Sequence, residues 1–449
     1  MSTILAPEDL KEVNADETGG IATGGSASRD NSALPGWFRE LQTEGWEKFE
    51  SLPMPARNNE AWRFANIKSL DLSSFTAAQP VSDSVRRALL DRSASLEKTA
   101  GRMVFANDAL LQREVLADSL RAKGVIFEPL DVAITKHADI FRKHFMSQDA
   151  VLGSEKFAAL HKARVTSGTL LYVPRGVEIE MPIEVFHWLH GANASVFPHT
   201  LLIADDHSKV TLVDYFESAD DAPGFACGVN DLHVGAGAKL TYIAVQNWNR
   251  KTRALHINST QVGRDANATA MHLNLGSAYA RTESVSRLTG AGGRSDMLSV
   301  CVADGAQEFD QRTLQDHQQP NTASDLLYKN SLDDRARTIF AGLIRVQPHA
   351  HHTDAYQKVR NLLLSDDAEA NSAPGLEILA DDVRCTHGAT SGQLDSEELF
   401  YMLARGIPRK VAQQLIVFGF LDEVTQRLRN EPVEEKLREL VRARFAEKK

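Results

Sequence analysis

Cys385 and His387 stand two residues apart in the stretch PGLEILADDVRCTHGATSGQLD, residues 374–395. Apolar residues alternate with other residues over 376–380, which predicts a strand. Side chains two residues apart on a strand point to the same face. A thiol and an imidazole would then offer one soft and one borderline ligand to a transition metal. The alternative is a buried thiol beside a hydrogen-bonded imidazole. The small residues 388–390 predict a corner after this pair.

The remaining cysteines and histidines are weaker candidates for chemistry. Cys227 and Cys301 lie in apolar segments, which favours buried, inert thiols. Three dispersed cysteines can form neither a disulfide framework nor a four-cysteine cluster site. The segment QPHAHHTDAYQ holds the densest histidine cluster, His349, His351 and His352. A solvated strand face is favoured there over a metal site, because no further ligands stand nearby in the sequence.

Length and composition exclude several functional classes. The chain has 449 residues with 43% hydrophobic and 24% charged residues, which is typical of a globular protein with more than one domain. The formal charge of −10 argues against nucleic acid as a partner. No apolar run approaches the roughly 18 residues that span a bilayer, and no secretory signal is apparent. We therefore expect a cytoplasmic protein without a membrane partner. The absence of a Walker A string argues against an ATPase.

The N-terminal third divides into a tail and a mixed domain. Residues 1–33 are rich in Gly, Ser, Thr and Asp, which predicts a disordered tail. Residues 34–150 alternate helical and short β patterns, starting with a helix over 35–51. Trp62 and Phe64 are expected to pack in the core and to anchor this domain onto the main body. Surface positions are expected for His137, His144 and His161.

Residues 151–394 consist of short β runs separated by turns of Asp, Gly and Ala. Several turns are about 26 to 32 residues apart, which is typical of stacked repeats. The absence of long helices between the strands excludes a doubly wound fold. Sandwiches and barrels share such short strands. The repetition favours a mainly β solenoid, in which each coil stacks only on its neighbours.

Residues 395–449 change to a helical period. Asp395 followed by Glu398 predicts a capped helix start, and Gly406 predicts its end. A second helix is expected to run to about Val424, and a third to start at Pro432. Two interpretations compete for this C-terminal helical domain. It can cap the solenoid, or it can provide a docking platform for a partner.

Three strings carry a family resemblance. They are LEI-x-ADDV-x-C-x-HGAT-x-GQLD near the C-terminus, the Arg57–Phe64 string R-x-x-E-x-W-R-F, and T-x-A-Y-Q-x-x-R-N-L-L-L-S at 353–365. They resemble the SufB/SufD family of scaffold proteins of the Suf iron–sulfur cluster assembly machinery, over roughly residues 37–424. The first string is similar to the SufD branch, because the SufB branch usually has a string rich in Glu and His there. In the third string we expect Gln357 and Asn361 to satisfy backbone groups between coils.

The resemblance implies a right-handed parallel β-helix and a non-catalytic scaffold subunit, not an enzyme. It implies a heterodimer with SufB, binding of the ATPase SufC, and an iron–sulfur cluster formed transiently at the SufB interface, with no permanent cofactor. His387 would be a ligand or proton acceptor for cluster iron, Cys385 either an auxiliary thiolate or a packing thiol, and SufB would supply the other ligands. A homodimer, a SufB-type paralogue and a polysaccharide-acting β-helix enzyme are the alternatives. For SufC the expected contacts are Leu399, Leu403, Gly406, Pro408, Leu415, Phe418 and Leu421.

Overall fold

The structure is a computed structural model of the chain. It describes residues 20–22, 34–56 and 58–446. Arg57 of the family string lies outside the described residues, as does the predicted disordered tail apart from residues 20–22. None of the helices in the described part of the chain combines the length and apolar character that crossing a bilayer needs.

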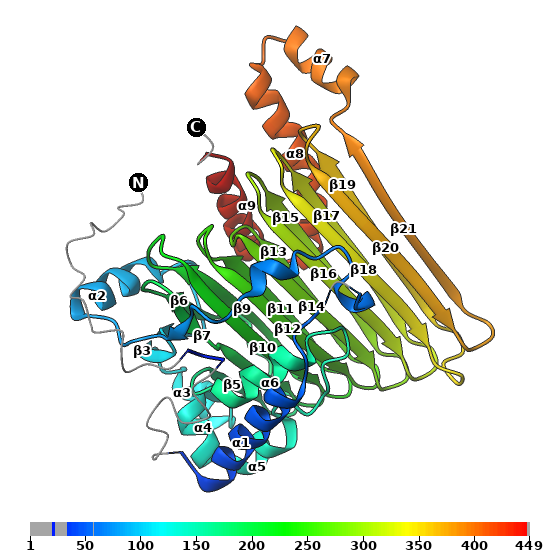
Figure 1. Cartoon of the computed structure of the whole chain (residues 1–449). Coiled ribbons are helices and arrows are strands. Elements are labelled where there is room, and N and C mark those ends of the chain that lie inside the picture. The colour runs from blue at the N-terminus through cyan, green and yellow to red at the C-terminus, as the bar shows by residue number, and fades with distance from the viewer. Residues whose placement is uncertain (1–19, 23–33, 57, 447–449) are drawn as a thin grey trace.

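Two sheets stacked face to face form the body of the molecule (Figure 1). In the described residues sheet A contains eleven strands and sheet B contains ten. Strand β5 pairs in parallel with β8, and β6 pairs in parallel with β9. From β8 and β9 onward each strand pairs in parallel with the second strand after it, so each coil adds one strand to each sheet. This confirms the predicted parallel β-solenoid. Sheet A contains β1 (Thr76–Ala77), β4 (Ile126–Pro129), β5 (Thr169–Val173), β7 (Ala194–Val196), β8 (His199–Ala204), β10 (Gly224–Val234), β12 (Arg253–Val262), β14 (Tyr279–Leu288), β16 (Glu308–His317), β18 (Arg337–Val346) and β20 (Glu369–Ile378). Sheet B contains β2 (Gly101–Ala106), β3 (Ala109–Arg113), β6 (Ile183–Leu189), β9 (Lys209–Ser218), β11 (Lys239–Asn247), β13 (Asn267–Asn274), β15 (Arg294–Ala303), β17 (Ala323–Leu332), β19 (Asp354–Leu363) and β21 (Arg384–Gln393).

The turns from sheet A to sheet B explain the repeat that the sequence shows. Each places one residue at a φ between +52° and +75°. Only small or locally hydrogen-bonding residues adopt this left-handed conformation readily. The positions recur about every 30 residues, within the range expected of stacked repeats. They are Gly176, His207, Gly237, Asp265, Gly292, Asn321, His352 and Asp382.

The space between the sheets is partly apolar and partly filled by hydrogen-bonded polar side chains. Apolar residues such as Leu202, Leu240 and Phe309 form the largest buried cluster. Asn361 donates to the carbonyl of Thr390 on the next coil at 3.2 Å, as expected from the sequence. The expectation for Gln357 was wrong, because its amide donates to a side chain and not to the backbone.

Helices close the N-terminal end of the solenoid. They are α1 (Gly36–Ser51), α2 (Asp83–Arg92), α3 (Asp118–Ala122), α4 (Leu130–Lys136), α5 (Ala138–His144) and α6 (Glu155–Arg164), with 3-10 turns at Glu60–Trp62 and Ile67–Leu70. Helix α1 matches the predicted helix to within a residue. At this end β3 and β4 pair antiparallel with their neighbours and cover the sheet edges.

Two expectations for this region were wrong. Phe64 is 45% exposed, and its backbone takes a left-handed φ of 70° that interrupts the local chain path. Trp62 is buried as predicted, and its indole N–H donates to the carbonyl of Gly153 at 2.7 Å. His161 is fully buried, not on the surface, since its ring bonds the Cys227 carbonyl and His199 between α6 and sheet A.

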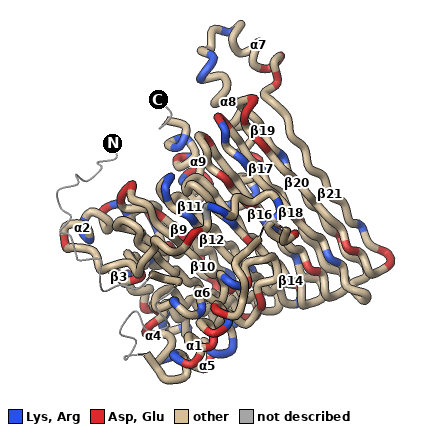
Figure 2. Tube along the Cα trace, viewed as in Figure 1, with Lys and Arg blue, Asp and Glu red and all other residues tan. Residues whose placement is uncertain are grey.

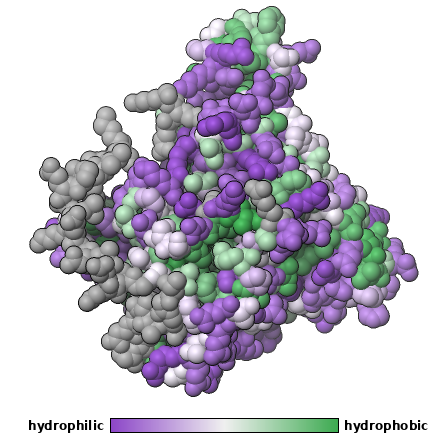
Figure 3. Space-filling view, in the orientation of Figure 1, coloured by the Kyte–Doolittle hydropathy of each residue, from purple (hydrophilic) through white to green (hydrophobic). Residues whose placement is uncertain are grey.

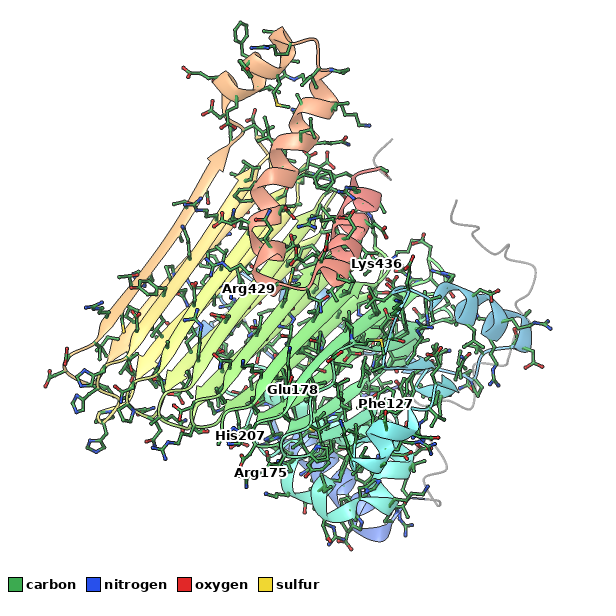
Figure 4. The ribbon with its side chains drawn as sticks, turned by 180° about the vertical axis from the view of Figure 1, so that it is seen from behind. Phe127, Arg175, Glu178, His207, Arg429 and Lys436 are labelled. Atoms are coloured by element: carbon green, nitrogen blue, oxygen red, sulfur yellow. The ribbon has the colours of Figure 1, made fainter. Side chains whose placement is uncertain are left out.

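Three C-terminal helices follow the last strand: α7 (Ser396–Ala404), α8 (Arg409–Thr425) and α9 (Glu431–Ala446), with a 3-10 turn at Gln426–Leu428. Asp395 caps α7 by accepting from the N–H groups of Glu397 and Glu398, and Gly406 ends the turn after it at a φ of 80°. Both features agree with the prediction. The second half of α8 and all of α9 lie against sheet B, whereas α7 extends past the ends of the strands (Figure 4).

Candidate functional site

Cys385 and His387 lie on the last strand, β21, with side chains on the inward face. In the register of β19 with β21, Cys385 pairs with Ala355 and His387 pairs with Gln357. Ala355 and Gln357 are almost completely buried between the sheets. In-register neighbours of parallel strands point to the same side. The predicted shared face is therefore confirmed, and it is the interior face at the end of the solenoid.

The thiol and the imidazole differ in exposure. His387 is exposed, whereas Cys385 is half-buried. Cys385 packs with Val383 against a small apolar cluster that includes Ile344 and Val346. Burial raises the pKa of the Cys385 thiol, and the nearby carboxylate of Asp354 raises it further. The thiol is thus neutral until a cation displaces its proton.

The C-terminal end of the solenoid is open. Strands β20 and β21 each have a neighbour on only one side in the described part of the chain, and most of their side chains are at least partly exposed. Leu376, Ile378 and Leu379 are exposed at the end of β20. Figure 3 shows apolar area at the edge of the molecule where Figure 1 draws the end of β20. Strand β21 is almost free of charge along its length (Figure 2). Unpaired, uncharged edge strands are templates for pairing with another chain.

The predicted corner at residues 388–390 is wrong. Strand β21 runs without interruption from Arg384 to Gln393, in register with β19. A Cβ added to Gly388 or to Gly392 would meet no atom within 4 Å. These glycines therefore lie where space is open, and they extend the flat edge that carries His387.

The histidine cluster lies in a turn, so the predicted strand face is wrong. His349, His351 and His352 occupy the turn between β18 and β19 and are exposed. His351 bonds the carbonyl of Asp381 at 3.1 Å, and His352 lies 2.9 Å from the Asp382 carboxylate. Within the described residues, no three His, Cys, Asp or Glu side chains come close enough to hold a metal ion. The described residues therefore do not complete a metal site with side chains of these four types alone.

A buried hydrogen-bond chain beneath His387 was missed by the sequence reasoning. Gln357 donates to the side-chain oxygen of Gln315 at 3.4 Å, and Gln315 donates to the Ser324 hydroxyl at 2.7 Å. Ser324 lies 2.8 Å from Nε2 of His317. Burial lowers the pKa of His317 to about 4, so its ring is neutral. The sequence signal was available, since Gln357 stands in the same period-two pattern as the apolar residues of its strand.

The seven predicted contact residues differ in exposure. Leu399 and Leu421 are buried, and Leu421 packs against sheet B together with Val417. Leu403 and Phe418 are partly buried. Gly406, Pro408 and Leu415 are exposed. The predicted set omitted three exposed apolar residues close by, Phe400, Tyr401 and Val411. Figure 3 shows apolar side chains gathered on the projecting helix α7.

The fold and the site define a class of protein: a parallel β-solenoid that is covered at one end, open at the other and extended by projecting helices. Two family models together match most of the chain. They are "SUF system FeS cluster assembly, SufBD core domain" over residues 187–420 and "SufBD protein N-terminal region" over residues 32–185. The chain therefore belongs to the SufBD family of iron–sulfur cluster assembly proteins.

Individual relatives agree with this assignment. The chain is 29% identical to the iron–sulfur cluster assembly protein SufD of Bacillus subtilis over 410 residues, 90% of this chain and 93% of that protein. It is 29% identical to SufD of Escherichia coli over 423 residues, 91% of this chain and 95% of that protein. Identity to SufB of Bacillus subtilis is 26% over 414 residues, 88% of this chain and 86% of that protein. The similarity is thus to the SufD branch, as the C-terminal string predicted.

Proposed function

We propose that this chain is a non-catalytic scaffold subunit that pairs through the open end of its solenoid with a SufB-type paralogue. The observation that carries the proposal is the rim formed by β20 and β21, each paired on one side in the described part of the chain, where β21 presents His387 and Cys385. A paralogous solenoid with an open end of its own would extend both sheets. Without such a partner, the same edges are free to pair with a second copy of this chain.

The substrate of this site is a nascent iron–sulfur cluster. His387 supplies an imidazole for iron, and Cys385 supplies a thiolate once the cation displaces its proton. The described residues bring no third ligand to this pair, so the paralogue would supply the rest. Such a shared site forms only in the complex, and it dissolves when the two solenoids separate.

The C-terminal helices are the proposed docking platform for a SufC-type ATPase. One half of the helical domain is fixed on sheet B by Val417 and Leu421, and the other half projects with exposed apolar side chains. The predicted cap over the end of the solenoid is wrong, because α8 and α9 pack against sheet B and leave the edges of β20 and β21 exposed. The docking platform is the alternative that we propose. Nucleotide-driven movement of the ATPase would then reach the rim through β21, which leads directly into α7.

A proline in the free edge tests the pairing. Arg384 donates its N–H to Thr353 on the coil of β19 at 2.8 Å. Because successive N–H groups alternate sides in a parallel ladder, the N–H of Ala389 points to the free edge. The variant Ala389→Pro removes an outward donor and keeps every bond to β19, and edge strands tolerate proline.

On co-expression with the SufB-type and SufC-type proteins of the same organism, the wild type and the Ala389→Val control should elute together with both partners. Ala389→Pro should keep the far-ultraviolet spectrum of the wild type and lose the SufB-type protein. Retention of that partner by a folded Ala389→Pro chain would place the interface elsewhere.

A further inference from the structure

The amide of Gln357 has one fixed orientation. Gln315 donates from Nε2 to the hydroxyl of Ser324 and to the backbone carbonyl of Tyr356, at 2.7 and 3.2 Å. A carbonyl can only accept, so the nitrogen of Gln315 must lie on that side and its Oε1 on the other. Oε1 of Gln315 then accepts from Nε2 of Gln357. This leaves Oε1 of Gln357 at the far end of the chain.

That oxygen is a buried acceptor without a donor. Gln357 is 2% exposed, and its Oε1 has no hydrogen-bond partner among the described residues. A buried polar atom left unpaired destabilises a folded protein. We therefore expect a neighbouring residue to supply a hydrogen-bond donor to the Oε1 atom of Gln357.

His387 is the neighbouring group that can supply the donor. In the register of sheet B, Gln357 lies between Leu326 on β17 and His387 on β21. Leu326 has no polar hydrogen on its side chain. His387 carries its imidazole on the same face of the adjacent strand, whose backbone lies about 4.8 Å away, and its ring makes no hydrogen bond within the described residues.

The backbone opposite is shaped to let the Gln357 amide cross the interior. A Cβ at Gly342 would lie 2.4 Å from Nε2 of Gln357 and 2.6 Å from the hydroxyl of Thr313. Any side chain at Gly342 would displace the amide from its place. The glycine at position 342 therefore leaves the space through which the Gln357 side chain extends from sheet B to sheet A.

We propose that Gln357 is a positioning residue, whose side-chain oxygen accepts the ring N–H of His387. The bond fixes the ring plane and the tautomer, and the second ring nitrogen presents its lone pair at the open rim. Ligating histidines generally donate their other N–H to such an acceptor. The inference rests on the proposed function, since it names what orients the imidazole offered to iron. It does not require that a cluster be present.

The contact is tested on the isolated full-length chain by ¹H–¹⁵N spectra of the imidazole N–H groups. Ring N–H protons of exposed histidines exchange too fast to be seen, whereas hydrogen-bonded ones persist. We expect one such resonance in the wild type that disappears in His387→Ala. It should be lost in Gln357→Leu and in Gln357→Met, and it should persist in Gln357→Glu, which retains an acceptor.

Gln311→Leu is the matched control. Gln311 is an equally buried interior amide, but it lies on β16 of sheet A and is not a register neighbour of His387. The resonance should persist in this control. Its absence from the wild type, or its survival in folded Gln357→Leu or Gln357→Met chains, would overturn the proposal. Using two replacements keeps the test decisive if one of them fails to fold.

The assembled complex separates this inference from the proposed function. Iron and acid-labile sulfide should fall by about 10-fold in Gln357→Leu, the lower range for loss of a partner that orients a metal ligand, and recover in Gln357→Glu. Full cluster content in His387→Ala would refute the role of His387 in assembly, and the spectra would still decide whether Gln357 holds the ring.

Discussion

The guanidinium of Arg281 lies 3.8 Å from the centre of the Trp62 ring. It also lies 2.5 Å from the carboxylate of Asp310 and 2.7 Å from that of Glu283. Its remaining N–H groups donate to the carbonyls of Ala61 and Leu152. One fully buried side chain on β14 therefore joins two N-terminal segments to the outer face of sheet A.

Replacing Arg281 by Ala should destabilise the chain by about 3–5 kcal/mol, because two buried carboxylates lose their counter-charge. Urea unfolding followed by tryptophan fluorescence measures the change. Arg264→Ala is the control, because the Arg264–Asp265 pair is solvent-exposed and contributes little. A loss below about 1 kcal/mol in Arg281→Ala, the range of an exposed pair, would show that the carboxylates find other partners.

The buried carboxyl group of Asp231 should make the free energy of unfolding depend on pH. Burial raises its pKa to about 7, although the hydrogen bond that it accepts from the Met146 N–H opposes this rise. An acid whose pKa is higher in the folded than in the unfolded chain binds more protons when folded between the two values. The stability that this group contributes is therefore full below about pH 4 and declines until about pH 7, by about 1.4 kcal/mol for each pH unit between the two pKa values.

The variant Asp231→Asn removes this titration and keeps an acceptor for the Met146 N–H. Its stability relative to the wild type should rise between about pH 5 and about pH 8, as measured by urea midpoints at both values. The neighbouring His199 should not mask the effect, because burial lowers its pKa well below the usual range. Parallel profiles for the two chains would contradict the assignment.

The projecting part of the C-terminal helices should carry the contact with the ATPase. Phe400 is 71% exposed on α7, whereas Leu421 on α8 is 2% exposed. Phe400→Asp should weaken binding of a SufC-type ATPase by about 2 kcal/mol or more, the range of an aromatic hot spot, with unfolding unchanged. Isothermal titration calorimetry gives the affinity.

Two controls bracket this prediction. Val115→Asp places the same charge at an exposed apolar residue of the N-terminal region and should leave the affinity unchanged. Leu421→Ala should instead lower stability by about 2–5 kcal/mol, because it opens a cavity against sheet B. Normal ATPase binding by Phe400→Asp would move the platform away from α7.

The solenoid could be predicted because its turns and apolar strands repeat. The left-handed turn residues need Gly, Asn, Asp or His, so the period of about 30 residues is visible in the sequence. The capped start of α7 and the extent of α1 follow equally local rules. These features depend only on residues that are close together in the sequence.

Strands β14 and β16 lack the apolar alternation that predicts a strand, for a physical reason. Their outward residues include Arg281, Asp310 and Arg312, which are buried only because the N-terminal segments cover them. Their inward residues, such as Gln311 and Gln315, are buried in hydrogen-bonded chains. A strand that is polar on both faces shows no apolar alternation, although it is buried.

The site was predicted only in part for a similar reason. The shared face of Cys385 and His387 follows from their spacing alone. This face is the interior face at an open end, next to Gln357. Its position depends on the pairing of β21 with β19, which lies about 30 residues earlier in the sequence. The exposed position of Phe64 depends on a left-handed backbone conformation that the residues around it do not predict.

In the proposed function, an imidazole at the rim of the solenoid takes part in cluster assembly on a surface shared with the paralogue. The direct measurement is the iron and acid-labile sulfide content of the complex purified with the SufB-type and SufC-type proteins. His387→Ala should retain both partners and lose most of the iron and sulfide. His351→Ala, an exposed histidine in the turn between β18 and β19, should match the wild type. Wild-type cluster content in an intact His387→Ala complex would contradict the account.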